Sequence, residues 1–172
     1  MKENIKTLVD ALVADRNLPD EGLRALIEAG GEDAAYLRLR GSDVCESVYG
    51  KAVYLRGLVE FTNYCRNDCL YCGLRRSNRS CERYRLTEEE VLDCAVRGYR
   101  LGFRTIVLQG GEDGGFSDES VVSVVRKIKE NCPDTAVTLS IGERDAGTYQ
   151  AFFDAGADRY LLREETASPE LY

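Results

Sequence analysis

Cys65, Cys69 and Cys72 follow one another at C-x3-C-x2-C spacing, which is the pattern in this chain that most directly indicates chemistry. Spacers of three and two residues allow one loop to wrap around a metal centre. Soft thiolate ligands favour iron–sulfur clusters, zinc or copper(I). On a [4Fe–4S] cluster, three thiolates would leave one iron without a protein ligand, so that iron could bind a small molecule.

Zinc is the structural alternative at the same loop, with Cys81 as a fourth ligand. Structural zinc sites usually pair two short Cys knuckles, whereas a single cysteine follows this loop after a longer step. The zinc hypothesis describes a non-catalytic α/β interaction module. The spacing favours an iron–sulfur cluster over this module.

The chain has seven cysteines and no histidine among its 172 residues. Without histidine, the usual general base and all His-containing zinc sites are excluded. An odd number of cysteines argues against a disulfide framework. We assign structural roles to Cys45, Cys81, Cys94 and Cys132, and the helical spacing around Cys94 predicts that it is buried.

The charge pattern argues against nucleic acid as a partner. The formal net charge is -7, and charges of both signs are mixed along the chain without a basic stripe. No segment reaches the ~20 apolar residues that a membrane-spanning helix requires, and the N-terminus carries acidic residues where a signal peptide would be apolar. We expect a cytoplasmic protein that does not associate with membranes.

Hydrophobic periodicity divides the chain into an N-terminal helical extension, residues 1–50, and an alternating α/β region, residues 51–172. The cysteines directly follow a predicted strand at 53–61. Helices are predicted at 87–101, 117–131 and 145–155, and further strands at 105–108, 136–141 and 159–162. Strands separated by single helices predict a parallel sheet.

Four strands with their helices amount to about half of a (β/α)8 barrel of the TIM type. Residues 167–172 contain a capping Ser followed by Pro and Glu, which predicts the start of another helix. We therefore interpret the chain as the N-terminal half of a barrel. Because half a barrel has an open sheet edge, we expect it to be unstable or inactive alone.

With Tyr71 before the last cysteine, the loop satisfies C-x3-C-x-aromatic-C and resembles the radical S-adenosylmethionine (SAM) superfamily. Further segments are similar to the HydE-type [FeFe]-hydrogenase maturases, which are related to biotin synthase and methylornithine synthase. These segments are residues 60–63, 72–76, 83–87, 106–113, 137–143 and 159–166. The resemblance implies a radical SAM (β/α) barrel with a [4Fe–4S] cluster on the three cysteines and SAM as second cofactor.

The same resemblance implies roles for individual residues. The adenine of SAM would lie against Tyr71, the amino group of SAM would contact residues 110–112, and the ribose of SAM would contact Glu165. In the alternative interpretation Tyr71 is a core aromatic, and Gly110, Gly111 and Glu112 form an ordinary strand-to-helix turn. Relatives often have Ser in place of Gly110, so a contact from that hydroxyl is absent here.

Thr138 and Arg163 would face the barrel cavity and anionic groups of the substrate, by the same resemblance. Their structural alternative is a surface ion pair, which contributes little to stability. Their positions at predicted strand ends of a parallel barrel favour the substrate cavity.

Two enzymatic hypotheses follow from the resemblance. In the first, the enzyme reductively cleaves SAM to a 5′-deoxyadenosyl radical during hydrogenase maturation. Its partners would be a small substrate such as an iron carbonyl–cyanide cysteine complex, an electron donor such as ferredoxin or flavodoxin, and the other hydrogenase maturases. In the second, it resembles biotin synthase or methylornithine synthase and performs sulfur insertion or rearrangement.

Overall fold

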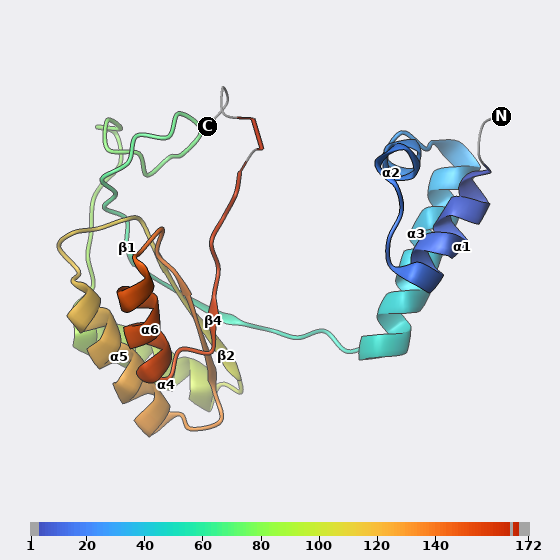
Figure 1. Cartoon of the computed structure of the whole chain (residues 1–172). Helices are drawn as coiled ribbons and strands as arrows, with labels where there is room; N and C mark the ends of the chain where they lie inside the picture. The colour runs from blue at the N-terminus through green and yellow to red at the C-terminus, as the bar shows by residue number, and fades with distance from the viewer. Residues whose placement is uncertain (1–3, 166, 169–172) are drawn as a thin grey trace. The chain divides into compact units, whose positions relative to one another are not determined.

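The computed structural model describes residues 4–165, 167 and 168, and it contains two compact units, Met1–Tyr54 and Leu55–Tyr172. The first unit includes the residues, 1–50, over which the sequence predicts a helical extension. It consists of α1 (Ile5–Asp15), α2 (Asp20–Ile27) and α3 (Gly31–Tyr49) (Figure 1). Leu8, Val9 and Leu26 form its small buried core.

The second unit contains a parallel sheet with the strand order β1-β2-β3-β4. The strands are β1 (Gly57–Thr62), β2 (Thr105–Gly110), β3 (Ala136–Ser140) and β4 (Arg159–Tyr160). The intervening helices are α4 (Glu88–Arg100), α5 (Asp118–Asn131) and α6 (Ala146–Asp154), and Figure 1 shows them against the sheet. The predicted parallel α/β arrangement is confirmed, although β1 begins at Gly57 instead of residue 53.

The helices cover one face of the sheet because alternate strand residues point toward them. Ile106 and Leu108 of β2, with Leu139 of β3, are buried in one core with Val124 and Val125 of α5. The residues between them point to the opposite face, which is the interior face of a (β/α) barrel. The strands therefore present polar side chains to that interior near their carboxyl ends.

Local capping fixes where the helices begin. The predicted capping box is present: Thr87 Oγ1 accepts from the backbone N–H of Glu90, and the Glu90 carboxylate accepts from the Thr87 N–H. At the starts of α5 and α6, the side chains of Ser117 and Asp145 accept hydrogen bonds from the backbone N–H groups of Ser120 and Thr148. These caps hold the strand-to-helix turns at the carboxyl edge of the sheet.

Cys94 is exposed, and the prediction that it is buried was wrong. On α4 the buried positions are Val91 and Ala95, which lie one turn apart and face the sheet. Cys94 is three residues after Val91, on the flank of the helix that turns away from this contact. Cys132, by contrast, is fully buried.

The predicted helix start at residues 167–172 lies mostly outside the described residues. Within the part of the chain that the structure describes, every helix is too short or too polar to cross a membrane.

Candidate functional site

A cavity of about 720 Å³ opens at the carboxyl edge of the sheet. All three motif cysteines line it, together with side chains and turns that follow β1, β2, β3 and β4. Its lining includes Cys65, Cys69, Tyr71, Cys72, Gly110, Gly111, Glu112, Ser140, Arg163 and Glu165. The topology therefore brings together residues that are up to a hundred positions apart in the sequence.

The three thiols are each partly buried, as expected of ligands that face a cavity and not a core. The Cys72 N–H donates to the Cys69 carbonyl at 3.0 Å, and the Leu74 N–H lies 3.4 Å from Cys72 Sγ, within reach of a hydrogen bond to sulfur. Backbone N–H groups directed at sulfur stabilise thiolates bound to iron–sulfur clusters. The donor set thus fits a cluster.

Among the described residues, no three Cys, Asp or Glu side chains converge tightly enough for a single metal ion. A [4Fe–4S] cluster does not require such convergence, since each thiolate binds a different iron. Cys81, the fourth ligand in the zinc hypothesis, does not line this cavity. Its Sγ instead lies 3.7 Å from Asn63 Nδ2.

The turn after β2 passes so close to the cysteine loop that only glycine fits. A Cβ on Gly111 would collide with the Tyr64 carbonyl and lie 2.7 Å from Cys65 Cβ. A Cβ on Gly110 would lie 2.7 Å from Thr62 Cγ2. The small residues thus allow the two backbone segments to approach, which explains why this geometry has no room for Ser in place of Gly110.

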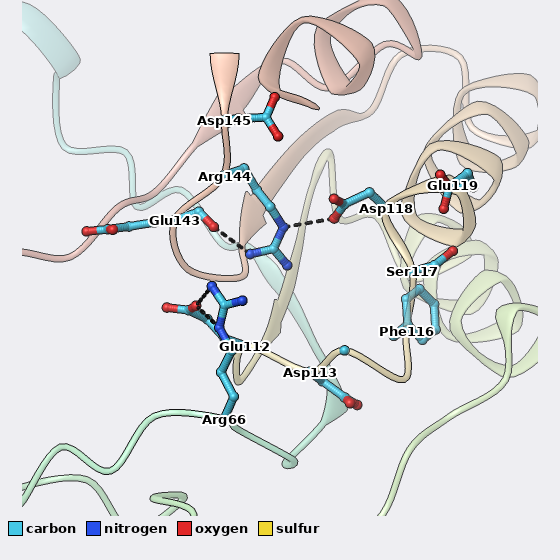
Figure 2. Close-up of a pocket in the computed structure, with 11 residues that line it drawn as sticks. Arg66, Glu112, Asp113, Phe116, Ser117, Asp118, Glu119, Glu143, Arg144 and Asp145 are labelled. Carbon is cyan, nitrogen blue, oxygen red and sulfur yellow. Dashed lines mark hydrogen bonds and ion pairs between the residues drawn. The ribbon is translucent and has the colours of Figure 1, made fainter. Parts of the chain in front are cut away.

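Glu112 joins this turn to the loop between the first two cysteines (Figure 2). Its Oε2 forms an ion pair with Arg66 Nη2 at 2.7 Å and accepts a hydrogen bond from Arg66 Nε at 3.0 Å, and its Oε1 accepts from Asn67 Nδ2 at 2.8 Å. The backbone N–H of Arg66 donates in addition to the Glu112 carbonyl at 3.0 Å. The sequence did not reveal these partners, because nothing local links residue 112 to residue 66.

The turn after β3 supports Glu112 from the other side. Gly142 adopts a φ of +84°, and a Cβ there would collide with the Glu112 side chain. The Gly142 carbonyl accepts from the Tyr160 hydroxyl at 2.5 Å. Burial raises the pKa of Tyr160 to about 12, so the phenol remains protonated as a donor.

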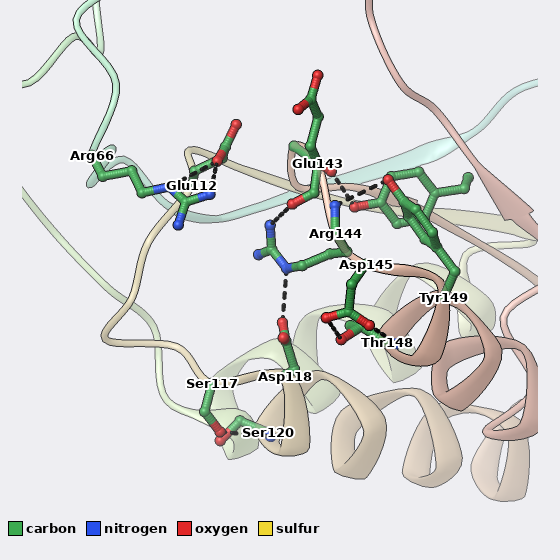
Figure 3. Close-up of polar contacts among 12 residues, drawn as sticks. Arg66, Glu112, Ser117, Asp118, Ser120, Glu143, Arg144, Asp145, Thr148 and Tyr149 are labelled. Atoms are coloured by element: carbon green, nitrogen blue, oxygen red, sulfur yellow. Dashed lines mark hydrogen bonds and ion pairs between the residues drawn. The ribbon is translucent and has the colours of Figure 1, made fainter.

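The neighbouring pocket of about 610 Å³ is lined mostly by charged residues, several of which pair with one another or with nearby backbone groups (Figures 2 and 3). Arg144 donates to Asp118 at 2.8 Å and to the carbonyl of Glu143 at 2.7 Å. Figure 3 shows that these contacts join the starts of α5 and α6. We interpret this pocket as the outer support of the turns.

Asp113 is buried and lies at the centre of a hydrogen-bond network. Arg85 donates to both of its carboxylate oxygens at 2.6 Å, Thr62 Oγ1 donates at 2.6 Å and the Gly115 N–H donates at 2.8 Å. Burial raises the pKa of Asp113, but these hydrogen bonds outweigh it and hold the pKa below its ordinary value. Arg85 also lies over the Tyr64 ring, 4.7 Å from its centroid.

Comparison with protein-family models matches residues 59–172 to the radical SAM superfamily. The chain belongs to the radical SAM superfamily. The match contains the cysteine loop, the turn after β2 and all the residues that line the cavity.

Among curated relatives of this radical SAM chain, the [FeFe] hydrogenase maturase subunit HydE of Thermotoga maritima is 47% identical over 72% of the chain and 35% of its own length. The 3-methylornithine synthase of Methanosarcina acetivorans is 28% identical over 99% of the chain and 49% of its length. The crystal structure of methylornithine synthase (PylB) has a TM-score of 0.83 at 28% identity, covering 95% of the chain and 49% of that structure. The chain thus spans between a third and a half of these proteins, and its sheet corresponds to part of the radical SAM barrel.

The interior face of the radical SAM sheet carries a polar row at the level of Gln109. Gln109 Nε2 donates to Glu60 at 3.1 Å, and Arg163 donates to Gln109 Oε1 at 2.9 Å. Ser140 pairs in register with Gln109 and also lines the cavity. Glu60, Gln109 and Ser140 were not among the predicted site residues, although alternation along the predicted strands places them on this face.

Thr138 lies on the same interior face but one layer deeper. It pairs in register with Val107 and Arg159, and it is not part of the cavity lining. Tyr71 and Glu165 line the cavity, and the Tyr71 side chain is 56% exposed, so it is not a core aromatic. The structure therefore brings together all the predicted site residues except Thr138.

Proposed function

We propose that this chain binds a [4Fe–4S] cluster through Cys65, Cys69 and Cys72 and binds SAM in the adjoining cavity. The observation that carries the proposal is that the three thiols share one cavity with the turn at residues 110–112. The chemistry expected of such a cluster is one-electron reduction of SAM, which breaks a carbon–sulfur bond and yields methionine and a 5′-deoxyadenosyl radical.

The residues of the cavity suit the parts of SAM. Glu112 and the carbonyls of its turn can accept hydrogen bonds from an ammonium group, since a carboxylate retains acceptor capacity beyond its contacts with Arg66 and Asn67. Tyr71 offers an exposed ring for the adenine. Glu165 offers a carboxylate for the ribose hydroxyls.

The cavity beyond SAM would hold the substrate. Arg163 and the polar row at Gln109 line the interior side of the cavity, where a small anionic molecule could bind. Thr138 lies one layer deeper on the interior face than Gln109, so it would contact the substrate only from below this row. The cavity is large enough for a ligand of ordinary small-molecule size.

We further propose a role in [FeFe]-hydrogenase maturation, supported by 47% identity to HydE over the shared region. The substrate class would then be an iron carbonyl–cyanide cysteine complex. A ferredoxin or flavodoxin would supply electrons, and the other maturases would be partners. The fold match to PylB supports a second candidate function, a methylornithine synthase-like rearrangement.

The class of activity is tested by anaerobic reconstitution with iron and sulfide, reduction with dithionite and addition of SAM. We expect a SAM-responsive EPR signal from the reconstituted chain and its loss in Cys69→Ala, and any 5′-deoxyadenosine that the half barrel forms should be lost with it. Stoichiometric zinc binding without a SAM-responsive iron signal would refute the proposal in favour of the zinc module.

The two enzymatic candidates are separated by their products. Restoration of hydrogenase activity in a strain that lacks HydE would support the first candidate. Formation of 3-methylornithine by the reconstituted protein would support the second candidate and contradict the first.

A further inference from the structure

The cysteine loop lies in the long irregular segment between the end of β1 at Thr62 and the start of α4 at Glu88. Helices and strands therefore do not fix the relative positions of the three thiols. Ordering one residue costs roughly 1–2 kcal/mol in backbone conformational entropy. Some other set of contacts must hold this loop if it is to be ordered before a cluster binds.

Arg83 supplies such contacts through a single guanidinium group. Its Nη1 donates to the carbonyl of Asn63 and to that of Leu74 at 2.9 Å. Its Nη2 donates to the carbonyls of Arg75 at 2.8 Å and Asn78 at 3.3 Å. Four backbone acceptors from both sides of the loop thus converge on one cation.

These acceptors are at the two ends of the cysteine loop. Asn63 is two residues before Cys65, and Leu74 is two residues after Cys72. The planar guanidinium presents its donors in a fixed fork, so it also fixes the distance between the two loop ends. A lysine ammonium in its place would have only three donors on a flexible stem.

Asn63 completes the arrangement from the opposite direction, and we call Asn63 and Arg83 together the clasp. The Asn63 side chain is buried, its Oδ1 accepts from the Tyr84 N–H at 2.8 Å, and its Nδ2 donates to the Glu82 carbonyl at 2.7 Å. Arg83 therefore binds the backbone carbonyl of Asn63, and the Asn63 side chain binds the backbone on both sides of Arg83.

The clasp is anchored to the sheet. Thr62 and Arg85 form an antiparallel bridge, and the Leu86 N–H donates to the Phe61 carbonyl at 2.8 Å. Phe61 belongs to the hydrophobic core. The segment that contains Arg83 consequently has a fixed position relative to β1. The hydrogen bonds of Arg83 in turn hold the ends of the cysteine loop relative to that segment.

We propose that Arg83, held in place by Asn63, is a positioning residue that keeps the cysteine loop in its cluster-binding arrangement before iron arrives. The proposal rests on the proposed function only in taking the loop as the site of the cluster. Pre-ordering lowers the entropy that cluster binding must otherwise overcome, so it strengthens retention of the cluster.

The test uses the full chain with Arg83→Lys and Arg83→Ala, and Arg79→Ala as the matched control on the same loop, where Arg79 is exposed. Iron release from the reconstituted protein to a ferrous chelator is followed by absorbance. We expect iron release to be about tenfold faster in Arg83→Ala, which corresponds to ~1.4 kcal/mol. Arg83→Lys should accelerate release clearly but by a smaller factor. Arg79→Ala should leave the rate of release unchanged.

A second measurement distinguishes positioning of the loop from a contribution to the fold. Because the hydrogen bonds of Arg83 within the described part of the chain go to backbone carbonyls of the irregular segment, far-UV circular dichroism should show nearly unchanged Tm values in Arg83→Lys and Arg83→Ala. Wild-type iron release in both variants would overturn the proposal. So would lowered Tm values with unchanged release per folded chain.

Hydrogen exchange of the iron-free protein provides a readout that does not depend on a cluster. The amides of Cys72 and Arg76 form bonds within the loop, and we expect faster exchange at both in Arg83→Lys. If the wild-type chain takes up no iron, the proposed function fails, yet this exchange measurement still decides the role of Arg83. Unchanged exchange at both amides would contradict it.

Discussion

Glu112 Oε2 forms an ion pair with Arg66 Nη2 at 2.7 Å, and this contact joins the turn after β2 to the loop that carries the motif cysteines. The Arg66 side chain is 69% exposed while that of Glu112 is 14% exposed, so solvent screens the pair from one side. The pair itself should therefore contribute no more than about 1 kcal/mol to stability.

Glu112→Ala and Arg66→Ala should affect SAM affinity to different degrees. If Glu112 accepts from the SAM ammonium, its loss removes a charge-assisted hydrogen bond worth roughly 1.5–3 kcal/mol, so Kd should rise at least tenfold. Arg66→Ala removes only the support of Glu112 and should raise Kd by about threefold or less. Equilibrium binding of SAM to the cluster-loaded variants measures both, and equal effects would exclude a direct contact from Glu112.

Gly111→Ala should prevent normal assembly of the cysteine loop. The new Cβ would overlap the Tyr64 carbonyl and crowd Cys65, and backbone cannot move aside as the end of a flexible side chain can. We expect iron content after reconstitution to fall several-fold, measured per folded chain.

Gly114→Ala is the matched control for this substitution. Gly114 lies in the same turn and has no strained φ, and a Cβ added there would have no heavy atom of the described residues within 4 Å. It should retain wild-type iron content. Equal iron loss in both variants would show that the turn responds to any added methyl group and would contradict the close-approach explanation.

The cysteine loop, the alternating elements and the Thr87 capping box could be predicted because they depend on residues close together in sequence. The spacing of apolar residues and cysteines, and the residues that cap helices, indicate directly where these elements lie. The prediction for Cys94 failed because helical periodicity gives the apolar stripe but not which flank faces the sheet. Only packing of α4 through Val91 and Ala95 settles that orientation.

The contacts that hold the site together could not be predicted from local patterns. Glu112 with Arg66, and Arg83 with the Asn63 carbonyl, are long-range pairs whose partners depend on the path of an irregular segment. Similarly, the depth of Thr138 follows from the register of β3 with β2, which the sequence of either strand alone does not determine.

Asp113→Asn should destabilise the protein by about 1–3 kcal/mol. The Asn amide nitrogen would have to face donors from Arg85, Thr62 or Gly115, which leaves buried donors without acceptors. Urea unfolding at neutral pH measures this difference. A change below about 0.5 kcal/mol would show that the network contributes little.

The destabilisation should depend on pH in a direction set by the lowered pKa of Asp113. Since the folded-state pKa lies below the unfolded value, the carboxylate contributes stability above about pH 4 and loses it as pH falls through the folded-state pKa. The difference between wild type and Asp113→Asn should thus be constant from pH 7 to about pH 5 and shrink below about pH 4. A difference that grows on acidification would contradict the assignment.

Tyr160→Phe should remove the hydroxyl that supports the Gly142 turn while preserving the ring that packs against Phe152 and Tyr149. Loss of this hydrogen bond should lower the free energy of unfolding by about 0.5–1.5 kcal/mol at pH 8. Gly142 lies against Glu112, so we also expect a modest loss of SAM affinity.

Alkaline titration tests the same residue independently. Burial raises the pKa of Tyr160 to about 12 in the folded protein, above the ordinary value of about 10. Its contribution to stability is therefore complete below about pH 10 and is lost as pH rises through 12, so the stability difference between wild type and Tyr160→Phe should narrow over that range. In absorbance at 295 nm, the variant should lack one late-titrating tyrosine. An unchanged late step would assign the raised pKa to another residue and remove the basis for this pH dependence.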